Sequence, residues 1–331
     1  MAAVMLTLPA VAAAHGGATN ASDAAALRHD WLSAWRPAWP EFATIVIAAV
    51  LYISRAKTLG RRLPRWRAVC FASGLVVLAF AGASPIDAIG EGGLFSVHML
   101  QHMLIGDLAA LLLVLGVTGP ILQPALQFKW VQRLRKLTHP MAACAIWAVI
   151  LVGWHLPVMY EAALGNQAIH ALEHASFLLG GALMWAPILE TLPAPEWFGT
   201  GAKLGYIFGI RTVDAILANV FWWAGTPFYA SYEQTAPLWG VSALEDQGYA
   251  GTVMMAWTGT VTLIVASVLF FKMAREGELR QALIEHGLDP VTVRRAVRYG
   301  RGELLASRHG VTLGDPPPPV DGALDRLERG S

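Results

Sequence analysis

Seven apolar stretches, each close to the length of a bilayer-spanning helix, constrain this chain most. A spanning α-helix needs about 17–25 mostly apolar residues. The chain has 331 residues, of which 55% are hydrophobic and 14% charged, whereas about a quarter of the residues in soluble domains are charged. We therefore predict an all-α polytopic membrane protein with seven transmembrane helices. They are expected at 41–56, 66–83, 94–117, 140–162, 166–189, 203–224 and 248–271.

The charged residues between these stretches predict their orientation. Lys and Arg gather in the first and third connections and in the tail, while the second, fourth and sixth connections hold acidic residues and no Lys or Arg. Lys203 is the one clear positive charge of the fifth connection. Because positive loops stay on the cytoplasmic side, we expect the N-terminus outside and the C-terminus in the cytoplasm.

The regions outside the spans have distinct compositions. Residues 1–14 are a short apolar run that ends in three alanines, which resembles a signal peptide with its cleavage site. We expect a periplasmic segment at 15–40, a seven-helix transmembrane domain at 41–271 and a cytoplasmic basic, Pro-rich tail at 272–331. The connection 118–139 contains an amphipathic stretch, and we expect it to lie along the inner membrane surface.

Five histidines are predicted to lie at one depth in the membrane. An α-helix rises about 1.5 Å per residue, so the five fall roughly 6–12 Å below the outer surface. Ionisable groups inside a bilayer are costly and usually functional, so this layer is the candidate site. Two of its three groups are i,i+4 pairs, each of which projects from one helix face. The histidines are His98, His102, His155, His170 and His174.

Two methionines of the last span join the predicted layer. Met254 and Met255 fall at about the same depth as the histidines. Cu(I) suits imidazole and thioether ligands, whereas packing in an apolar core is an equally good interpretation of both methionines. Glu173 precedes His174 but lies about 100° away around the helix, so the sequence does not place its carboxylate on the same face.

Other polar residues lie within the spans. Arg211 and Asp214 are spaced i,i+3, which favours an internal ion pair. Asp107 is either a proton-relay group or a hydrogen-bonding partner for a neighbouring span. His15 and His29 lie in the polar N-terminal segment, where a solvated role and metal capture are equally good interpretations.

Several classes of function lack their sequence signals. We find no Gly-rich phosphate loop, no nucleophile elbow and no basic, aromatic nucleic-acid surface. The two cysteines, Cys70 and Cys144, form neither a CxxC site nor a disulfide framework. No carboxylate or second catalytic group clearly accompanies the histidines, so we do not expect an enzyme.

The motifs around the histidines resemble the CtaG family of multi-span cytochrome c oxidase assembly proteins. The resemblance covers about 40–272, and its combination of segments is specific. It implies a bacterial inner-membrane protein that helps copper reach a haem–copper oxidase, with oxidase subunits as partners and the five histidines, Met254 and Met255 as metal residues. The matching segments are Ser84-Pro85, LFSVHMLQHMLIGD at 94–107, WHLPVMYEAAL at 154–164, IHALEHASFLLGGALMWAPI at 169–188, FYASY at 228–232 and DQGYAGTVMMAWTG at 246–259.

Three interpretations of the layer remain open from the sequence. The first is a non-enzymatic copper chaperone that binds Cu(I), exchanges it with periplasmic copper carriers and passes it to the oxidase. The second is a haem-binding electron-transfer protein, because membrane cytochromes hold haem between histidines of facing helices. The third is a copper permease in which Asp107, Arg211 and Asp214 continue the path inward. Helix rotation is unknown at this stage, so the histidines that ligate together cannot be chosen.

Overall fold

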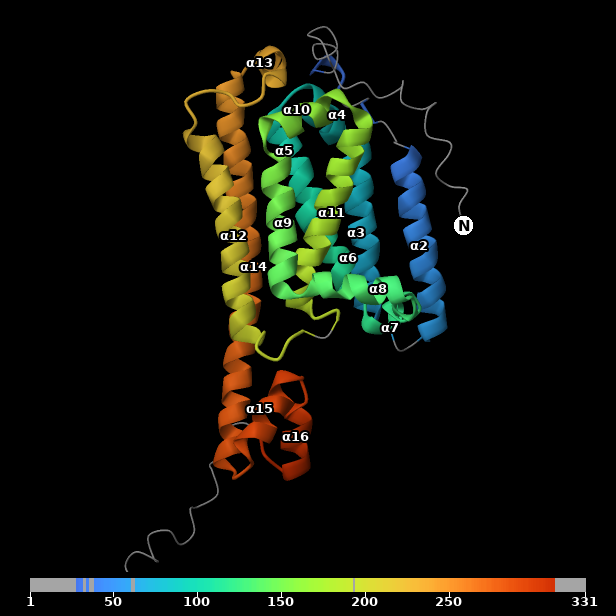
Figure 1. Ribbon diagram of the computed structural model, residues 1–331, viewed down its shortest axis with the longest axis vertical. Helices are drawn as coiled ribbons and strands as arrows, with labels where there is room; N and C mark the ends of the chain where they lie inside the picture. Colours follow the sequence, from blue (N-terminus) through green and yellow to red (C-terminus); the bar gives the residue numbers. More distant parts are fainter. Residues whose placement is uncertain (1–27, 32–33, 36–38, 61–62, 193, 313–331) are drawn as a thin grey trace, which may run out of the picture. The chain divides into compact units, whose positions relative to one another are not determined.

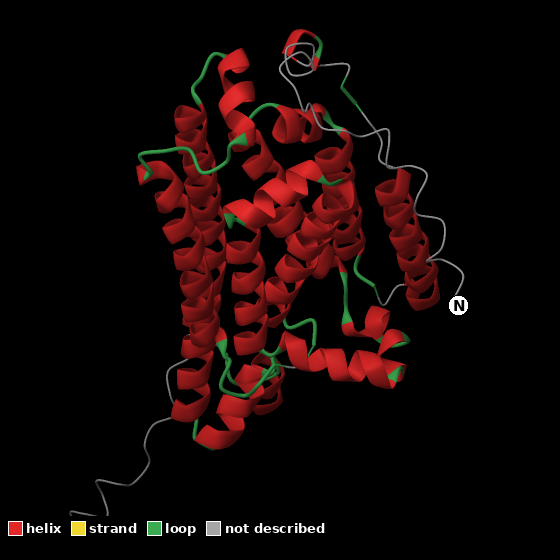
Figure 2. Cartoon of the chain, turned by 45° about the horizontal axis from the view of Figure 1, so that its top comes forward, coloured by secondary structure: helices red, strands yellow, loops and turns green. Residues whose placement is uncertain are grey.

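The computed structural model describes residues 28–31, 34–35, 39–60, 63–192 and 194–312, and every regular element in these ranges is a helix (Figure 2). The all-α prediction is therefore confirmed. The predicted signal peptide at 1–14, most of the segment at 15–40, His15 and the end of the tail lie outside the described residues.

Six helices within the described residues are long and apolar enough to cross a membrane. A seventh span results if the bent pair Val131–Thr138 and Pro140–Trp154, which meet at 84°, is counted as one. The membrane class is thus supported, with six spans or up to seven. The six lie in α2 (Trp39–Leu59), α3 (Arg65–Ala83), α5 to α6 (Phe95–Gly116), α11 (Gln167–Leu189), α12 (Thr200–Trp223) and α14 (Ala243–Glu285).

The fourth predicted span is not one continuous helix. Instead of a helix over 140–162, the chain forms α9 (Pro140–Trp154) and α10 (Pro157–Gly165). Pro157 lacks an amide hydrogen and keeps the residue before it out of the helical region, and Leu156 accordingly has φ −68° and ψ 131°. The 15 residues of α9 extend about 22 Å, less than the roughly 30 Å apolar core of a bilayer.

The chain divides into two compact units. The first comprises Met1–Pro195 and Phe208–Thr262, and the second comprises Glu196–Ile207 and Leu263–Ser331. The candidate site lies in the first unit, where α11 packs against α9, α6 and the neighbouring π-helix (Figure 1). Gly181 permits this contact, because a Cβ at that position would lie 1.7 Å from the carbonyl oxygen of Gly106.

The third span contains a π-helical turn below the histidines. It runs through α5 (Phe95–Met103), the π-helix Leu104–Ala109 and α6 (Ala110–Gly116). Such turns are rare and occur frequently at functional sites. This one begins two residues after His102 and contains Gly106, which faces Gly181. The close approach of α11 is therefore built into the segment next to the histidines.

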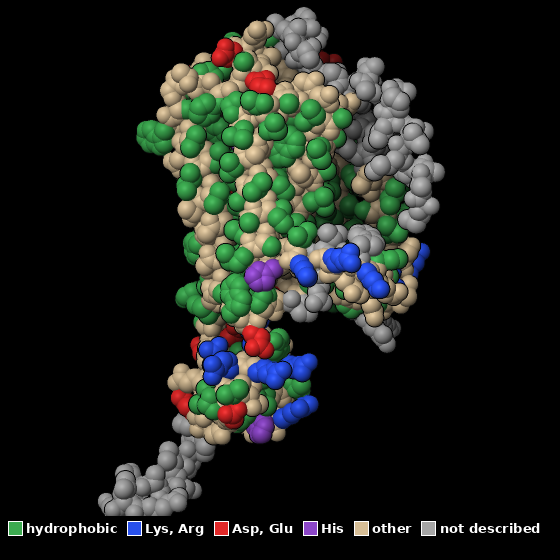
Figure 3. Space-filling model, in the orientation of Figure 1, with side chains coloured by type: hydrophobic (Ala, Val, Ile, Leu, Met, Phe, Trp, Pro, Cys, Tyr) green, Lys and Arg blue, Asp and Glu red, His purple; other side chains and the backbone are tan. Residues whose placement is uncertain are grey.

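The two ends of the first unit differ in charge. The connection 118–139 contains α7 (Gly119–Leu122) and α8 (Lys129–Leu134), and Lys and Arg side chains are visible at that level in Figure 3. The opposite end holds α4 (Pro85–Gly92), α10 and α13 (Ser231–Thr235), with acidic side chains and a broad hydrophobic surface between the ends.

The second unit contains the tail together with Glu196–Ile207 and the part of α14 from Leu263 onward. The last part of α14 packs with α15 (Pro290–Arg298) and α16 (Gly302–His309). Asp289 caps α15 by accepting hydrogen bonds from the backbone N–H and hydroxyl of Thr292, both at 2.8 Å. These bonds lower the pKa of the exposed Asp289 carboxyl. The apolar core comprises Leu279, Leu283, Val293, Val297, Ala306 and Val311.

Candidate metal centre

Three of the predicted histidines converge in the first unit. One ligand nitrogen from each of His98, His102 and His174 lies within 4.8 Å of the other two. The ring centroids of His98 and His102 are 4.3 Å apart, and that of His174 is 5.5 Å from His102. The three side chains are between 0% and 8% exposed. This arrangement has the composition of a buried all-imidazole metal site.

Helix capping places these histidines. The backbone N–H groups of Phe95 and Ser96 donate to the carboxylate of Asp246, at 2.6 and 3.2 Å, which anchors the start of α5 one turn before His98. At the start of α11, the side chain of Asn166 accepts from the backbone N–H of Ala168, at 2.9 Å. Both i,i+4 pairs therefore begin within the first two turns of an anchored helix, and the rings of the two pairs meet, with His98 and His170 centroids 5.4 Å apart.

Most ring nitrogens of the cluster lack hydrogen-bond partners. Among the described residues, none contacts Nε2 of His98, His170 or His174, or either ring nitrogen of His102, at hydrogen-bond distance. Buried polar atoms are nearly always paired, so unpaired ones require an explanation. A cation held between the rings supplies one, because it would take the lone pairs that no protein donor takes.

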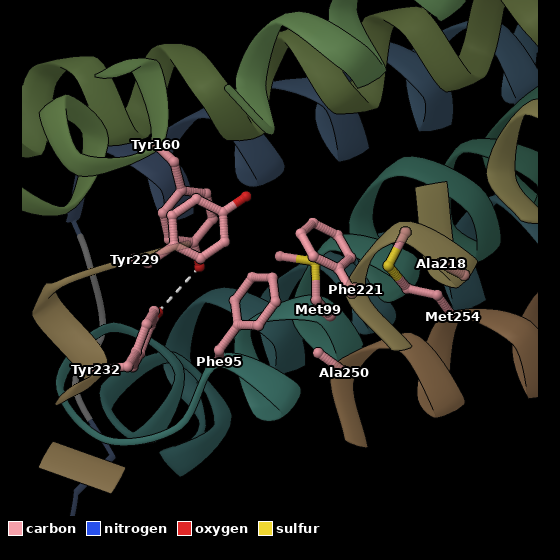
Figure 4. Close-up of a cluster of buried hydrophobic side chains, with 9 residues drawn as sticks. All are labelled: Phe95, Met99, Tyr160, Ala218, Phe221, Tyr229, Tyr232, Ala250 and Met254. Carbon is pink, nitrogen blue, oxygen red and sulfur yellow. Dashed lines mark hydrogen bonds between the residues drawn. The ribbon is translucent and has the colours of Figure 1, made fainter. Parts of the chain in front are cut away.

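Two tyrosines hold the other nitrogen of His98. Its Nδ1 lies 2.8 Å from the hydroxyl of Tyr160 and 3.1 Å from that of Tyr232. The two hydroxyls are 3.0 Å apart, and Tyr232 donates to the carbonyl of Gly90 at 2.7 Å. Tyr160 also stacks on Tyr229, with ring centroids 4.0 Å apart (Figure 4). This network orients His98 so that Nε2 faces the cluster.

Glu173 lies inside the cluster, so a carboxylate accompanies the histidines, contrary to the expectation from the sequence. Its side chain is 0% exposed, one carboxylate oxygen is 3.7 Å from Nε2 of His102, and neither oxygen has a hydrogen-bond partner among the described residues. A carboxylate oxygen of Glu173 also groups with ring nitrogens of His98 and His170 within 4.8 Å. The 100° separation from His174 did not exclude it, because α4 and α5 approach that flank of α11 as well.

His170 is paired with a residue of α4. Its Nδ1 lies 2.6 Å from a carboxylate oxygen of Glu91, whose side chain is 20% exposed. Ser84 caps α4, accepting from the backbone N–H of Ile86 at 3.3 Å, and Pro85 occupies the first helical position. The Ser84-Pro85 pair of the sequence motif thus starts the short helix that delivers Glu91 to the cluster.

The remaining predicted ligands do not belong to the three-histidine group, although the ring centroids of His155 and His102 are 6.4 Å apart. His155 is buried, with Nδ1 2.7 Å from the carbonyl of Leu151 and Nε2 3.3 Å from the sulfur of Met99. Met254 is buried among aromatic side chains next to the site (Figure 4). Met255 is 43% exposed, and the amide of Asn219 lies 3.9 Å from its sulfur. The structure therefore does not bring Met255 to the histidines.

The polar residues below the layer form a separate network. Arg211 binds Asp214 at 3.0 Å, which confirms the predicted ion pair, and also Asp107 at 2.8 Å. Asp107 accepts further hydrogen bonds from the indole N–H groups of Trp185 (3.0 Å) and Trp257 (2.9 Å). Of the two interpretations of Asp107, the structure therefore supports the one in which its carboxylate hydrogen-bonds to neighbouring spans.

Sequence reasoning missed several residues of this centre. Tyr160, Tyr229, Tyr232 and Asp246 all contact the cluster or its helix, and each lies within a segment that carries the family resemblance. Their positions in those segments were the available signal. Glu91 lay in an acidic connection and had no signal of its own, because its role depends on the short helix α4.

Together the fold and the site define a multi-span membrane protein with a buried histidine and carboxylate centre near one end of its helices. Comparison with known protein families shows which family of membrane proteins this is. The profile of the cytochrome c oxidase caa3 assembly factor family, also called CtaG, matches residues 46–276, which is well over half of the chain. The chain belongs to this family, as its motifs implied.

Its curated relatives are longer proteins. Uncharacterized proteins of Mycobacterium bovis and Mycobacterium tuberculosis are each 24% identical over 265 residues, covering 74% of this chain and 40% of theirs. An uncharacterized protein of Mycobacterium leprae is 23% identical over 257 residues, covering 71% of this chain and 38% of its own. The chain thus spans about 40% of the length of the first two. No solved structure matches it.

Proposed function

We propose that the chain is a copper-binding assembly factor for cytochrome c oxidase in the bacterial inner membrane. The observation that carries this proposal is the convergence of His98, His102 and His174, with ring nitrogens within 4.8 Å and most of them unpaired. Copper is the cargo in this proposal, bound and then released to an oxidase subunit. The protein acts as a chaperone and catalyses no reaction.

The ligand chemistry supports copper. Imidazole is a good ligand for copper, and Cu(I) favours soft or borderline donors. Three neutral imidazoles hold a monovalent ion without adding a buried negative charge. Met99 is buried next to His155, so a thioether lies close to the centre. The oxidase whose assembly the family name describes is a haem–copper enzyme, which gives the cargo a destination.

The distribution of charge supports an outward-facing site. The centre lies near the end of the helices that carries α4 and α10, while the Lys and Arg side chains of the connection 118–139 lie at the opposite end (Figures 1 and 3). Under the positive-inside rule, the centre then faces the periplasm, as does the N-terminus. Copper would arrive from periplasmic carriers and leave toward the outer part of the oxidase.

The packing disfavours the two other interpretations. The rings of His170 and His174 have centroids 4.0 Å apart, and those of His98 and His170 are 5.4 Å apart, so a porphyrin has no space between them. A permease path through Asp107 would meet the guanidinium of Arg211, 2.8 Å from that carboxylate. The buried guanidinium of Arg211, which pairs with Asp107 and Asp214, would repel a copper ion at this point of the path.

Copper loading of the purified protein tests the proposal. The wild-type protein in detergent is loaded with Cu(I) without oxygen, desalted and analysed for copper, and its optical spectrum is recorded. We expect close to one copper per chain, lost in His102→Ala/His174→Ala and retained in the control His309→Ala, whose imidazole is exposed on α16. In cells, the double variant should lower oxidase activity. Equal copper in the double variant and wild type would reject the site.

A further inference from the structure

A second group of possible ligands lies next to the three histidines. One ligand atom each from His98, His170 and Glu173 lies within 4.8 Å of the other two. This group has two imidazoles and a carboxylate, whereas the first has three imidazoles. His98 belongs to both groups. The centre therefore contains two positions that differ in ligand chemistry and share one ring.

Glu173 supplies the strongest indication that this second position takes a cation. Both of its oxygens are buried without a hydrogen-bond donor among the described residues, and its side chain is 0% exposed. Removing a carboxylate from water without partners is highly unfavourable. Nε2 of His170 and Nε2 of His98 are likewise unpaired. A divalent ion bound to all three would satisfy each of these atoms.

Glu91 gives this position the outer contact that metal-binding histidines usually have. Metal-ligating imidazoles commonly donate their other N–H to a carboxylate, which fixes the ring and raises its basicity. Nδ1 of His170 lies 2.6 Å from the Glu91 carboxylate, so Nε2 of the same ring is left for the ion. Glu91 is 20% exposed while Glu173 is fully buried, so solvent reaches the outer carboxylate of this position and not the inner one.

We propose that His98, His170 and Glu173 form a second binding position for a borderline divalent cation of the zinc class. Mixed imidazole and carboxylate ligands suit such ions. His98 has one unpaired nitrogen, since its Nδ1 is bonded to Tyr160 and Tyr232. A single Nε2 binds one ion at a time, so a divalent ion at this position excludes Cu(I) from the three-histidine position.

The second position takes another class of ion than the copper site and shares only His98 with it. Glu173, His170 and Glu91 serve the second position, and His102 and His174 serve the first. Variants of the two sets therefore separate the proposals. If the protein binds no Cu(I) but binds a divalent ion at the second position, the proposed function is wrong and the second position remains. If it binds Cu(I) but no divalent ion, the second position is wrong and the proposed function remains.

Cobalt titration tests the second position. Co²⁺ replaces zinc and has a visible absorption that reports its ligands. Full-length protein in detergent is titrated with CoCl₂, and the dissociation constants of wild type, Glu173→Gln, Glu91→Gln and His102→Ala are compared. Loss of outer contacts of metal ligands typically weakens binding about 10–100-fold. We expect weakening in that range for Glu91→Gln, at least as much for Glu173→Gln because it removes a direct ligand, near wild-type binding for His102→Ala, and no change for the exposed Glu233→Gln.

Competition on the wild-type protein provides a test without substitutions. Protein saturated with Co²⁺ is titrated with Cu(I), and the cobalt absorption is followed. We expect the cobalt absorption to fall as copper binds, so that each chain holds one metal ion in total throughout the titration. Simultaneous binding of both ions would overturn the shared use of His98. Unchanged Co²⁺ affinity in Glu173→Gln would overturn the second position itself. A Co²⁺ affinity that is lost in His102→Ala and kept in Glu173→Gln would do the same.

Discussion

The hydroxyl of Tyr160 lies 2.8 Å from Nδ1 of His98, and this contact determines which nitrogen of the ring can bind a metal. Tyr232 donates its proton to the Gly90 carbonyl, so its oxygen accepts from Tyr160. Tyr160 in turn accepts from Nδ1–H of His98. The opposite tautomer would leave Nε2–H as a buried donor without an acceptor. We therefore assign the proton to Nδ1 and the lone pair to Nε2.

Removing both hydroxyls should weaken copper binding. In Tyr160→Phe/Tyr232→Phe, His98 loses the contacts that fix its tautomer and orientation. Loss of such contacts typically weakens metal binding about 10–100-fold. A competition titration with a chromophoric Cu(I) chelator measures the dissociation constant. Tyr229→Phe is the control, because that hydroxyl binds the carbonyl of His155 at 2.9 Å and does not contact His98. An unchanged constant in the double variant would refute the assignment.

Gly181 should be required for the geometry of the centre. A Cβ there would lie 1.7 Å from the Gly106 carbonyl oxygen, so Gly181→Ala must move α11 away from the third span. His174 lies seven residues earlier on the same face and would move with it. We expect a lower melting temperature and weaker Cu(I) binding, both measured on purified protein. Gly209→Ala is the matched control, because a Cβ on Gly209 meets nothing within 4 Å.

Asp107 should be a stability residue with no role in binding copper. Asp107→Ala leaves the donors of Trp185, Arg211 and Trp257 without this acceptor. Breaking a buried ion pair by removing one partner costs about 3–5 kcal/mol. Trp257→Phe removes one hydrogen bond to a charged group, at about 1.5–3 kcal/mol. Thermal denaturation in detergent should rank the two in this order, and the folded fraction of Asp107→Ala should still bind copper. Equal melting temperatures for Asp107→Ala and wild type would contradict this role.

Destabilising the tail should leave metal binding at the centre unchanged. Leu283 is 0% exposed in the core of the second unit, and truncating a buried leucine to alanine typically costs about 2–5 kcal/mol. Leu283→Ala should make 290–309 more sensitive to protease and leave Cu(I) binding unchanged. Leu304→Ala, at a side chain that is 51% exposed, should change neither. Lost copper binding in a folded Leu283→Ala protein would show that the tail supports the site.

The class of fold could be predicted because it depends on local chemistry. Apolar length and helix rise identified the spans, and the spacing of His98 with His102 and of His170 with His174 placed both pairs on helix faces. The break at Leu156 was also local, since Pro157 causes it, but the apolar run from 140 to 162 concealed it. A long hydrophobic stretch thus predicts membrane residence better than helix continuity.

The family motifs carried more of the site than the histidine pattern did. Tyr160, Tyr232 and Asp246 lie in three separate motif segments, and the structure brings all of them to the start of α5. Periodicity within one helix cannot report such contacts, because it describes faces and not neighbours. A buried Tyr or Asp inside a matching segment is therefore a good candidate for a residue of the site, even where the periodicity of its own helix does not indicate one.

The all-helical membrane class could be read from the sequence, because composition and rise per residue are properties of each segment alone. The predicted layer of histidines at one depth follows from the same properties, but the side chains that meet depend on how the helices pack. His98, His102 and His174 converge while His155 turns toward Met99, and Glu173 enters the cluster while Met255 remains exposed. Helix rotation and neighbour order decide this, and they follow from packing between segments, such as the Gly181 and Gly106 contact.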